Sequence, residues 1–298
     1  MLDSAEDFLG RVTFVTGPEK HCGKTTFMNR AAELARRGAR AAGRQAPALL
    51  TVGYDGESRD FLSGARKPAV PVAAGDILVT AERFARPCSP EILDVLPGSS
   101  ALGRLCIAKA SRGATVALVG PESNALVGWA IRRIVDEGLT DTVLVDGAIN
   151  RMTQVASIAN ARFVYAIRVD GAGLGRAISR VRRLATLVRL PLAGDSQVDD
   201  AASFVLEGAL TTETAARLPP EARSVIVDDL TKVFLGEAEL AAFVRDRQLY
   251  VSWRIEFGGF IVACRGIADA AFNARLGDDS VSALVAFNPY EEPAWSAA

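Results

Sequence analysis

The sequence predicts an α/β protein whose mostly parallel sheet is flanked by helices. Short, continuously apolar segments recur along the chain, as at Val12–Val15, Ala48–Val52 and Thr142–Val145, and strands that are covered on both faces of a parallel sheet have this composition. Segments with the apolar spacing of a helix alternate with them. This alternation of strand and helix favours a sheet built from βαβ units.

The first of these strand-to-helix turns carries a phosphate-binding pattern. Residues 11–29 read RVTFVTGPEKHCGKTTFMN, in which an apolar run enters a glycine-containing turn and Lys24, Thr25 and Thr26 open a helical pattern. The N–H groups of such a loop converge on phosphate oxygens, the lysine adds positive charge, and the hydroxyl binds Mg²⁺. We therefore predict a P-loop NTPase-type fold. The alternative is an ordinary strand-to-helix turn.

The loop supplies most residues of the predicted nucleotide site. The nucleotide-binding residues are Gly17, Glu19, Lys20, His21, Cys22, Gly23, Lys24, Thr25 and Thr26. Among them Lys24 is also a catalytic candidate, and Thr25 is a candidate ligand of Mg²⁺.

The spacing of this loop differs from the commonest one. Gly17 and Gly23 enclose five residues, whereas the usual motif has four between its first glycine and the Gly-Lys pair. The longer loop resembles that of the dethiobiotin synthetase and cobyrinate amidotransferase branch of P-loop proteins. A Gly-Lys-Thr match arises by chance in many sequences, but the preceding strand and the following helix exclude most chance matches.

Two acidic residues complete the predicted site. Asp146 follows the apolar segment Thr142–Val145, which is the Walker B arrangement. We therefore expect it to hold Mg²⁺ directly or through water, and it is a catalytic candidate together with Lys24. Asp55 follows Ala48–Val52 and lies where the ends of parallel strands face the ligand crevice. It is a candidate catalytic residue. For both residues the alternative is a turn-forming aspartate.

Composition narrows the class of protein. The 298 residues are 49% hydrophobic and 23% charged, with a formal net charge of −1, so we expect neither nucleic acid nor a membrane as partner. The acidic N-terminal segment is unlike a signal peptide, and four cysteines are scattered without metal-binding spacing. We therefore expect a cytoplasmic protein with reduced thiols. The only histidine is His21, so a Ser-His-Asp enzyme would have to use this loop residue.

We predict two parts of the chain. Residues 1–195 form the nucleotide-binding domain and residues 196–298 a smaller α/β unit, because proline, glycine and acidic residues gather at Pro191–Asp200. Residues 61–112 are harder to interpret and are predicted as an insertion, forming either a lid or a partner surface. A helix is expected there at Pro90–Val95.

Further elements are expected later in the chain. An apolar strand at Ala114–Val119 and a helix at Gln154–Asn160 belong to the first part. Strands at Phe260–Cys264 and Ser282–Phe287 are placed in the smaller unit.

The chain as a whole resembles a family of P-loop reactivases. The similar segments are TGPEKHCGKTTFMNR, VGYDGESRD, VGPESN, LVDGAINR, LEGALT, VIVDDLTKVFL and AFNPY. They resemble the KamB or OrfX type of reactivase component, which is encoded beside adenosylcobalamin-dependent lysine 5,6-aminomutase and ornithine aminomutase. The resemblance covers most of the chain, and its most specific parts are the loop and LVDG.

The resemblance implies a function and roles for the site residues. It implies an ATPase that, with a MutL-like second subunit, exchanges damaged cobalamin on an aminomutase for fresh adenosylcobalamin. Gly17, Gly23, Lys24 and Thr25 would bind phosphate and Mg²⁺, Asp146 would complete the metal site, and Asp55 would orient water or act as a switch.

Two other functions remain open at this point. The first is an ATP-dependent ligase or amidotransferase of the dethiobiotin synthetase or cobyrinate synthase type, acting on a small carboxylate. The second is a binding module that senses nucleotide without turnover. The sequence has no base-reading motif that distinguishes ATP from GTP.

Overall fold

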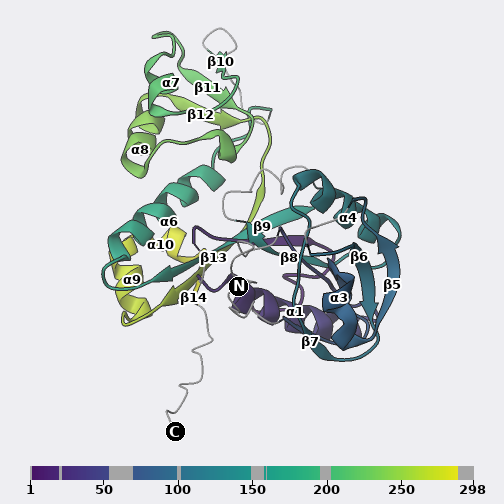
Figure 1. Cartoon of the computed structure of the whole chain (residues 1–298). Coiled ribbons are helices and arrows are strands. Elements are labelled where there is room, and N and C mark those ends of the chain that lie inside the picture. The colour runs from purple at the N-terminus through teal and green to yellow at the C-terminus, as the bar shows by residue number, and fades with distance from the viewer. Residues whose placement is uncertain are drawn as a thin grey trace. The chain divides into compact units, whose positions relative to one another are not determined.

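The computed structural model of the chain divides into two compact units (Figure 1). The described residues are 2–19, 22–53, 70–98, 102–148, 158, 160–194 and 203–287. Among them, the first unit runs to Ile167 and includes Ile261–Ala263, and the second contains Arg168–Phe260 and Cys264–Phe287. This division starts the second unit earlier than the boundary expected after residue 195, so helix α6 (Leu174–Val188) belongs to the second unit.

Most of the strands form one nine-stranded sheet, in the order β14-β13-β9-β1-β8-β2-β4-β6-β5. The strands are β1 Val12–Thr16, β2 Ala48–Thr51, β4 Ile77–Ala81, β5 Pro90–Val95, β6 Leu105–Ala110, β8 Val143–Ala148, β9 Ala161–Val169, β13 Glu256–Cys264 and β14 Val285–Phe287. The neighbours from β9 through β1, β8 and β2 to β4 pair in parallel, while β6 runs antiparallel to both β4 and β5. The expected α/β class with a mostly parallel sheet is confirmed.

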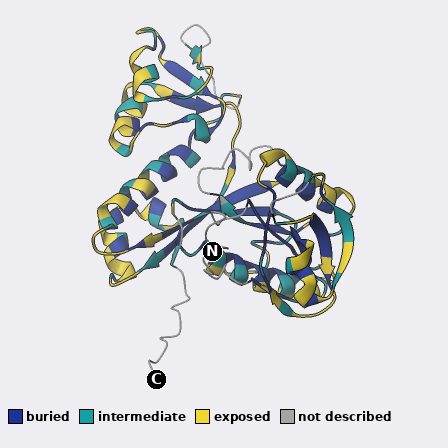
Figure 2. Ribbon diagram, in the orientation of Figure 1, coloured by how far each residue is buried: buried dark blue, intermediate teal, exposed yellow. Residues whose placement is uncertain are grey.

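The central strands are apolar because they are buried on both faces. Every residue of β1, β2 and β4 is buried, and Figure 2 shows these strands in dark blue. Phe14 on β1, Leu49 on β2 and Phe163 on β9 are at most 1% exposed. This burial explains why the sequence of each strand is a continuous apolar run and does not alternate.

Helices follow several of the strands. In the first unit they are α1 Lys24–Ala41, α3 Glu82–Ala85, the 3₁₀ turn η1 Arg86–Cys88 and α4 Asn124–Asp136. Helix α1 packs against β1 and β8 through a buried face that includes Phe27, Met28 and Ala31. No helix in the described part of the chain combines the length and apolar composition that a membrane span requires.

The second unit contains a smaller parallel sheet. Its strands, in the order β10-β11-β12, are β10 Ser203–Val205, β11 Ser224–Val227 and β12 Gln248–Val251. Its helices are α6, α7 Thr212–Ala216, the 3₁₀ turn η3 Leu230–Lys232, α8 Glu237–Asp246, α9 Asp269–Leu276 and α10 Asp279–Ser282. Helix α7 lies between β10 and β11 in the chain, and α8 lies between β11 and β12.

One predicted helix is wrong. Residues Pro90–Val95 form strand β5 at the edge of the nine-stranded sheet, where they pair with β6. Proline is tolerated at the first residue of an edge strand, where its missing N–H breaks no necessary ladder bond. The described part of the 61–112 region, including β4, β5 and β6, is therefore built largely into the main sheet.

Two other expectations change. The strands near residues 260–264 and 282–287 are β13 and β14, which extend the nine-stranded sheet and not the small one. The strand expected at Ala114–Val119 is shorter: β7, Ala114–Val116, pairs antiparallel with β3, Val70–Val72. The helix expected at 154–160 lies almost wholly outside the described residues.

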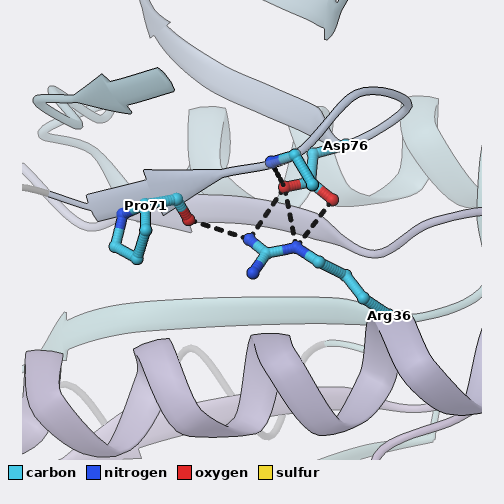
Figure 3. A network of polar contacts seen from close by, with 4 residues as sticks. Arg36, Pro71 and Asp76 are labelled. Atoms are coloured by element: carbon cyan, nitrogen blue, oxygen red, sulfur yellow. Dashed lines mark hydrogen bonds and ion pairs between the residues drawn. The ribbon is translucent and has the colours of Figure 1, made fainter. Parts of the chain in front are cut away.

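A buried ion pair anchors α1 to the segment that precedes β4 (Figure 3). The Nε of Arg36 donates to both carboxylate oxygens of Asp76, at 3.0 and 2.9 Å, and another guanidinium nitrogen donates to the carbonyl of Pro71 at 2.9 Å. Asp76 is fully buried and also accepts from the N–H of Ala73. Burial raises the pKa of the Asp76 carboxyl from its ordinary value, and the hydrogen bond and charge of Arg36 oppose this rise.

We predict that Arg36→Met destabilises the protein more than the double variant Arg36→Met/Asp76→Asn. Removing only Arg36 strands a buried carboxylate, at a cost of roughly 3 kcal/mol in the free energy of unfolding. Urea unfolding of the two variants and the wild type measures this difference.

In the single variant the folded pKa of Asp76 rises further above its unfolded value, so stability is lost as pH rises through that pKa. The loss in free energy of unfolding of Arg36→Met, relative to the wild type, should therefore be larger at about pH 8 than at about pH 5. Equal destabilisation of the two variants would show that the pair is not coupled.

Candidate phosphate and metal site

The loop between β1 and α1 needs glycine at both ends. At Gly17 an added Cβ would lie 2.4 Å from the carbonyl oxygen of Ala166 and 2.7 Å from the Sγ of Cys22, so no larger residue fits. Gly23 has a φ of 93°, in the left-handed region, and directly precedes α1. Close packing therefore requires glycine at position 17, and the left-handed backbone conformation favours glycine at position 23.

The first turn of α1 is suited to an anion. The N–H groups of a helix's first turn have no acceptor within the helix. Here Gly23 provides no side-chain cap, and no acidic residue lies in the first turn. The helix dipole adds partial positive charge at this end. Lys24, Thr25 and Thr26 occupy this turn, with Lys24 buried and Thr26 exposed.

Lys24 turns back onto its own loop. Its side-chain nitrogen donates to the carbonyl of Glu19 at 2.6 Å and approaches the Sγ of Cys22 at 3.4 Å. The lysine is 6% exposed. The loop therefore holds a buried ammonium beside the first turn of α1. Lys20 and His21, the other loop residues expected to bind nucleotide, lie outside the described residues.

Thr25 and Asp146 meet directly. The hydroxyl of Thr25 donates to Oδ2 of Asp146 at 2.6 Å, across 121 positions of sequence. Asp146 is on β8, where it pairs with Val15 of β1 on one side and with Thr51 of β2 on the other. The structure therefore brings together the two residues that the sequence predicted as metal ligands.

The chemistry of this pair suits Mg²⁺. A hydroxyl that donates its proton to a carboxylate keeps its oxygen lone pairs for a cation. Mg²⁺ is commonly held by one or two protein oxygens together with water and the phosphates of its substrate. In the described residues no group of three or more His, Cys, Asp or Glu side chains could hold a metal ion. That finding is compatible with a metal site that relies on phosphate oxygens.

Two contacts at Asp146 were not expected from the sequence. The main-chain carbonyl of Asp146 accepts from the N–H of Val52 at 2.9 Å and from the hydroxyl of Thr51 at 3.1 Å. The register between β1 and β8 then shifts, since Val15 pairs with Asp146 but Thr16 pairs with Ala148. Gly147 is the extra residue, with a φ of 82°. The one feature of the sequence that could have indicated these contacts is Thr51, a threonine at the end of the otherwise apolar strand β2.

One predicted site residue, Asp55, lies outside the described residues. Of the polar residues elsewhere in the first unit, Ser123 is the N-cap of α4, where its hydroxyl accepts from the N–H of Leu126. The four cysteines are free thiols, and burial raises the pKa of Cys106 to about 11, which keeps that thiol protonated.

Neither a protein-family model nor a curated protein matches this chain.

We predict that Gly17→Ala destabilises the protein by about 1–3 kcal/mol, because its methyl group would press on a main-chain carbonyl. Gly175→Ala is the matched control. Gly175 lies within α6, and an added Cβ there meets nothing within 4 Å, so alanine should stabilise the protein by up to about 1 kcal/mol. Urea unfolding distinguishes the two. Equal stabilities for the two variants would contradict the close packing at Gly17.

Proposed function

We propose that this protein binds ATP with Mg²⁺ and hydrolyses it as an accessory factor to a second protein. The observation that carries the proposal is the hydrogen bond of 2.6 Å between Thr25 and Asp146. It links the first turn of α1 to the end of β8, beside the loop that leaves β1. A phosphate loop and a Walker B carboxylate require this proximity, since both act on one phosphate-bound metal.

The proposed roles follow from the chemistry of each group. The main-chain N–H groups of the loop and of the first turn of α1 bind phosphate oxygens, and Lys24 exchanges its bond to the Glu19 carbonyl for one to phosphate. Thr25 and Asp146 would hold Mg²⁺, which would supply positive charge against the phosphates. Phosphoryl transfer depends mainly on such positioning and charge stabilisation, which are the roles that the proposal gives to these residues.

The accessory role is supported by the resemblance to the reactivases. In this proposal the γ-phosphate sets the state of nearby loops, and that state acts on a MutL-like subunit and a cobalamin-dependent aminomutase. Hydrolysis then resets the loops. Cofactor exchange on the aminomutase is the outcome that the resemblance implies.

We predict that two substitutions weaken ATP binding with different dependence on Mg²⁺, measured by calorimetry with Mg²⁺ and with a chelator. Lys24→Ala should weaken binding in both conditions, by roughly tenfold or more, because a charged hydrogen bond to phosphate is lost. Asp146→Asn should weaken binding only when Mg²⁺ is present. Lys109→Ala, at an exposed lysine on β6, is the matched control and should bind as the wild type does. Unchanged binding by Lys24→Ala would contradict the proposed phosphate site.

Turnover separates the accessory role from its alternatives. We expect slow release of phosphate from ATP by the protein alone, rising when a MutL-like subunit and an aminomutase are added. Product formed from a small carboxylate and ATP without a protein partner would instead identify a ligase. Tight binding with no phosphate release in any mixture would identify a nucleotide sensor.

A further inference from the structure

Thr51 contacts the metal-site strand from the neighbouring strand. It is the last residue of β2 and is 7% exposed. Its hydroxyl donates to the main-chain carbonyl of Asp146 at 3.1 Å. The same carbonyl already accepts the N–H of Val52 at 2.9 Å. One hydrogen bond satisfies a buried carbonyl, so the second bond is not needed to compensate for burial, and it fixes the direction of the peptide group.

The bond lies at the point where β8 departs from regular geometry. Gly147 is the extra residue of the bulge and has a φ of 82°. A Cβ added to Gly147 would stand 3.4 Å from the Thr51 hydroxyl oxygen. Bulges bend a strand and redirect the side chains beside them, and they are frequent next to functional sites. The Thr51 hydroxyl therefore bonds β8 directly before the bulge at Gly147, and the bulge affects how the Asp146 side chain is oriented.

Thr51 is itself held in place. An added Cβ at Gly120 would lie 1.5 Å from the Thr51 carbonyl oxygen, so the turn at Gly120 crosses the end of β2 in close contact. Two main-chain hydrogen bonds join this turn to Gly53, which follows β2. The N–H of Gly53 donates to the carbonyl of Pro121 at 2.6 Å, and the N–H of Gly120 donates to the carbonyl of Gly53 at 3.2 Å. A hydroxyl on a strand end packed in this way is a rigid support.

We propose that Thr51 is a positioning residue for the metal: its hydroxyl orients the bulged end of β8 so that the Asp146 carboxylate stays against Thr25. This inference rests on the proposed function and adds a residue to the same site. Among the described residues, the Thr51 hydroxyl and the Thr25 hydroxyl each bond Asp146 and not one another, so in this proposal Thr51 acts through Asp146. Its loss should weaken Mg²⁺ binding and leave phosphate binding intact.

The test compares Thr51→Val, which replaces the hydroxyl by a methyl of similar size, with Thr51→Ser, which restores a hydroxyl. Thr80→Val is the matched control, because Thr80 is a buried threonine on β4 whose hydroxyl bonds Ala117 and Val119 and not Asp146. Binding of the fluorescent analogue N-methylanthraniloyl-ATP is titrated with Mg²⁺ and repeated in chelator. Thermal unfolding of each variant reports its folding.

We expect Thr51→Val to need roughly three- to tenfold more Mg²⁺ for half-maximal binding, with unchanged affinity in chelator. Thr51→Ser and Thr80→Val should match the wild type. An unchanged Mg²⁺ requirement in a folded Thr51→Val would overturn the positioning role, and so would equal weakening with and without Mg²⁺. A wild type whose binding does not respond to Mg²⁺ would refute the proposed function itself.

Discussion

The hydrogen bond between Thr25 and Asp146 is the interaction on which the site depends. It exists because β8 lies directly beside β1 in parallel, so that the carboxyl end of β8 and the loop that leaves β1 reach the same edge of the sheet. Ligands of open α/β sheets bind at this edge. If another strand lay beside β1 on that side, Asp146 would be too far from the first turn of α1 to bond Thr25.

Helix α1 is fixed to the sheet at two places. Its first turn is joined to β8 through Thr25, and its later turns are joined to the segment before β4 through the ion pair of Arg36 and Asp76. Between them a buried apolar face packs on β1 and β8. A helix held in this way presents its N-terminal N–H groups in a constant direction, which is what recognition of phosphate requires.

The sequence predicted the elements whose signals are local. The two glycines mark the loop because backbone geometry demands them, Lys24 and Thr25 follow Gly23 directly, and Asp146 is identified by the apolar run before it. Strand β5 was missed because sheet pairing overrides the helical pattern at Pro90–Val95. The places of β13 and β14 in the main sheet depend on contacts between distant segments. Thr51 could not be singled out, since its role comes from pairing with β8 and from the bulge at Gly147.

A crystal structure of the protein with Mg²⁺ and a non-hydrolysable ATP analogue tests the central claim most directly. The account predicts that the phosphates lie between Gly17 and Thr26, and that the metal stands about 2.1 Å from the Thr25 hydroxyl oxygen, with Asp146 beside it. A nucleotide bound elsewhere, or a metal with no contact to this pair, would contradict it.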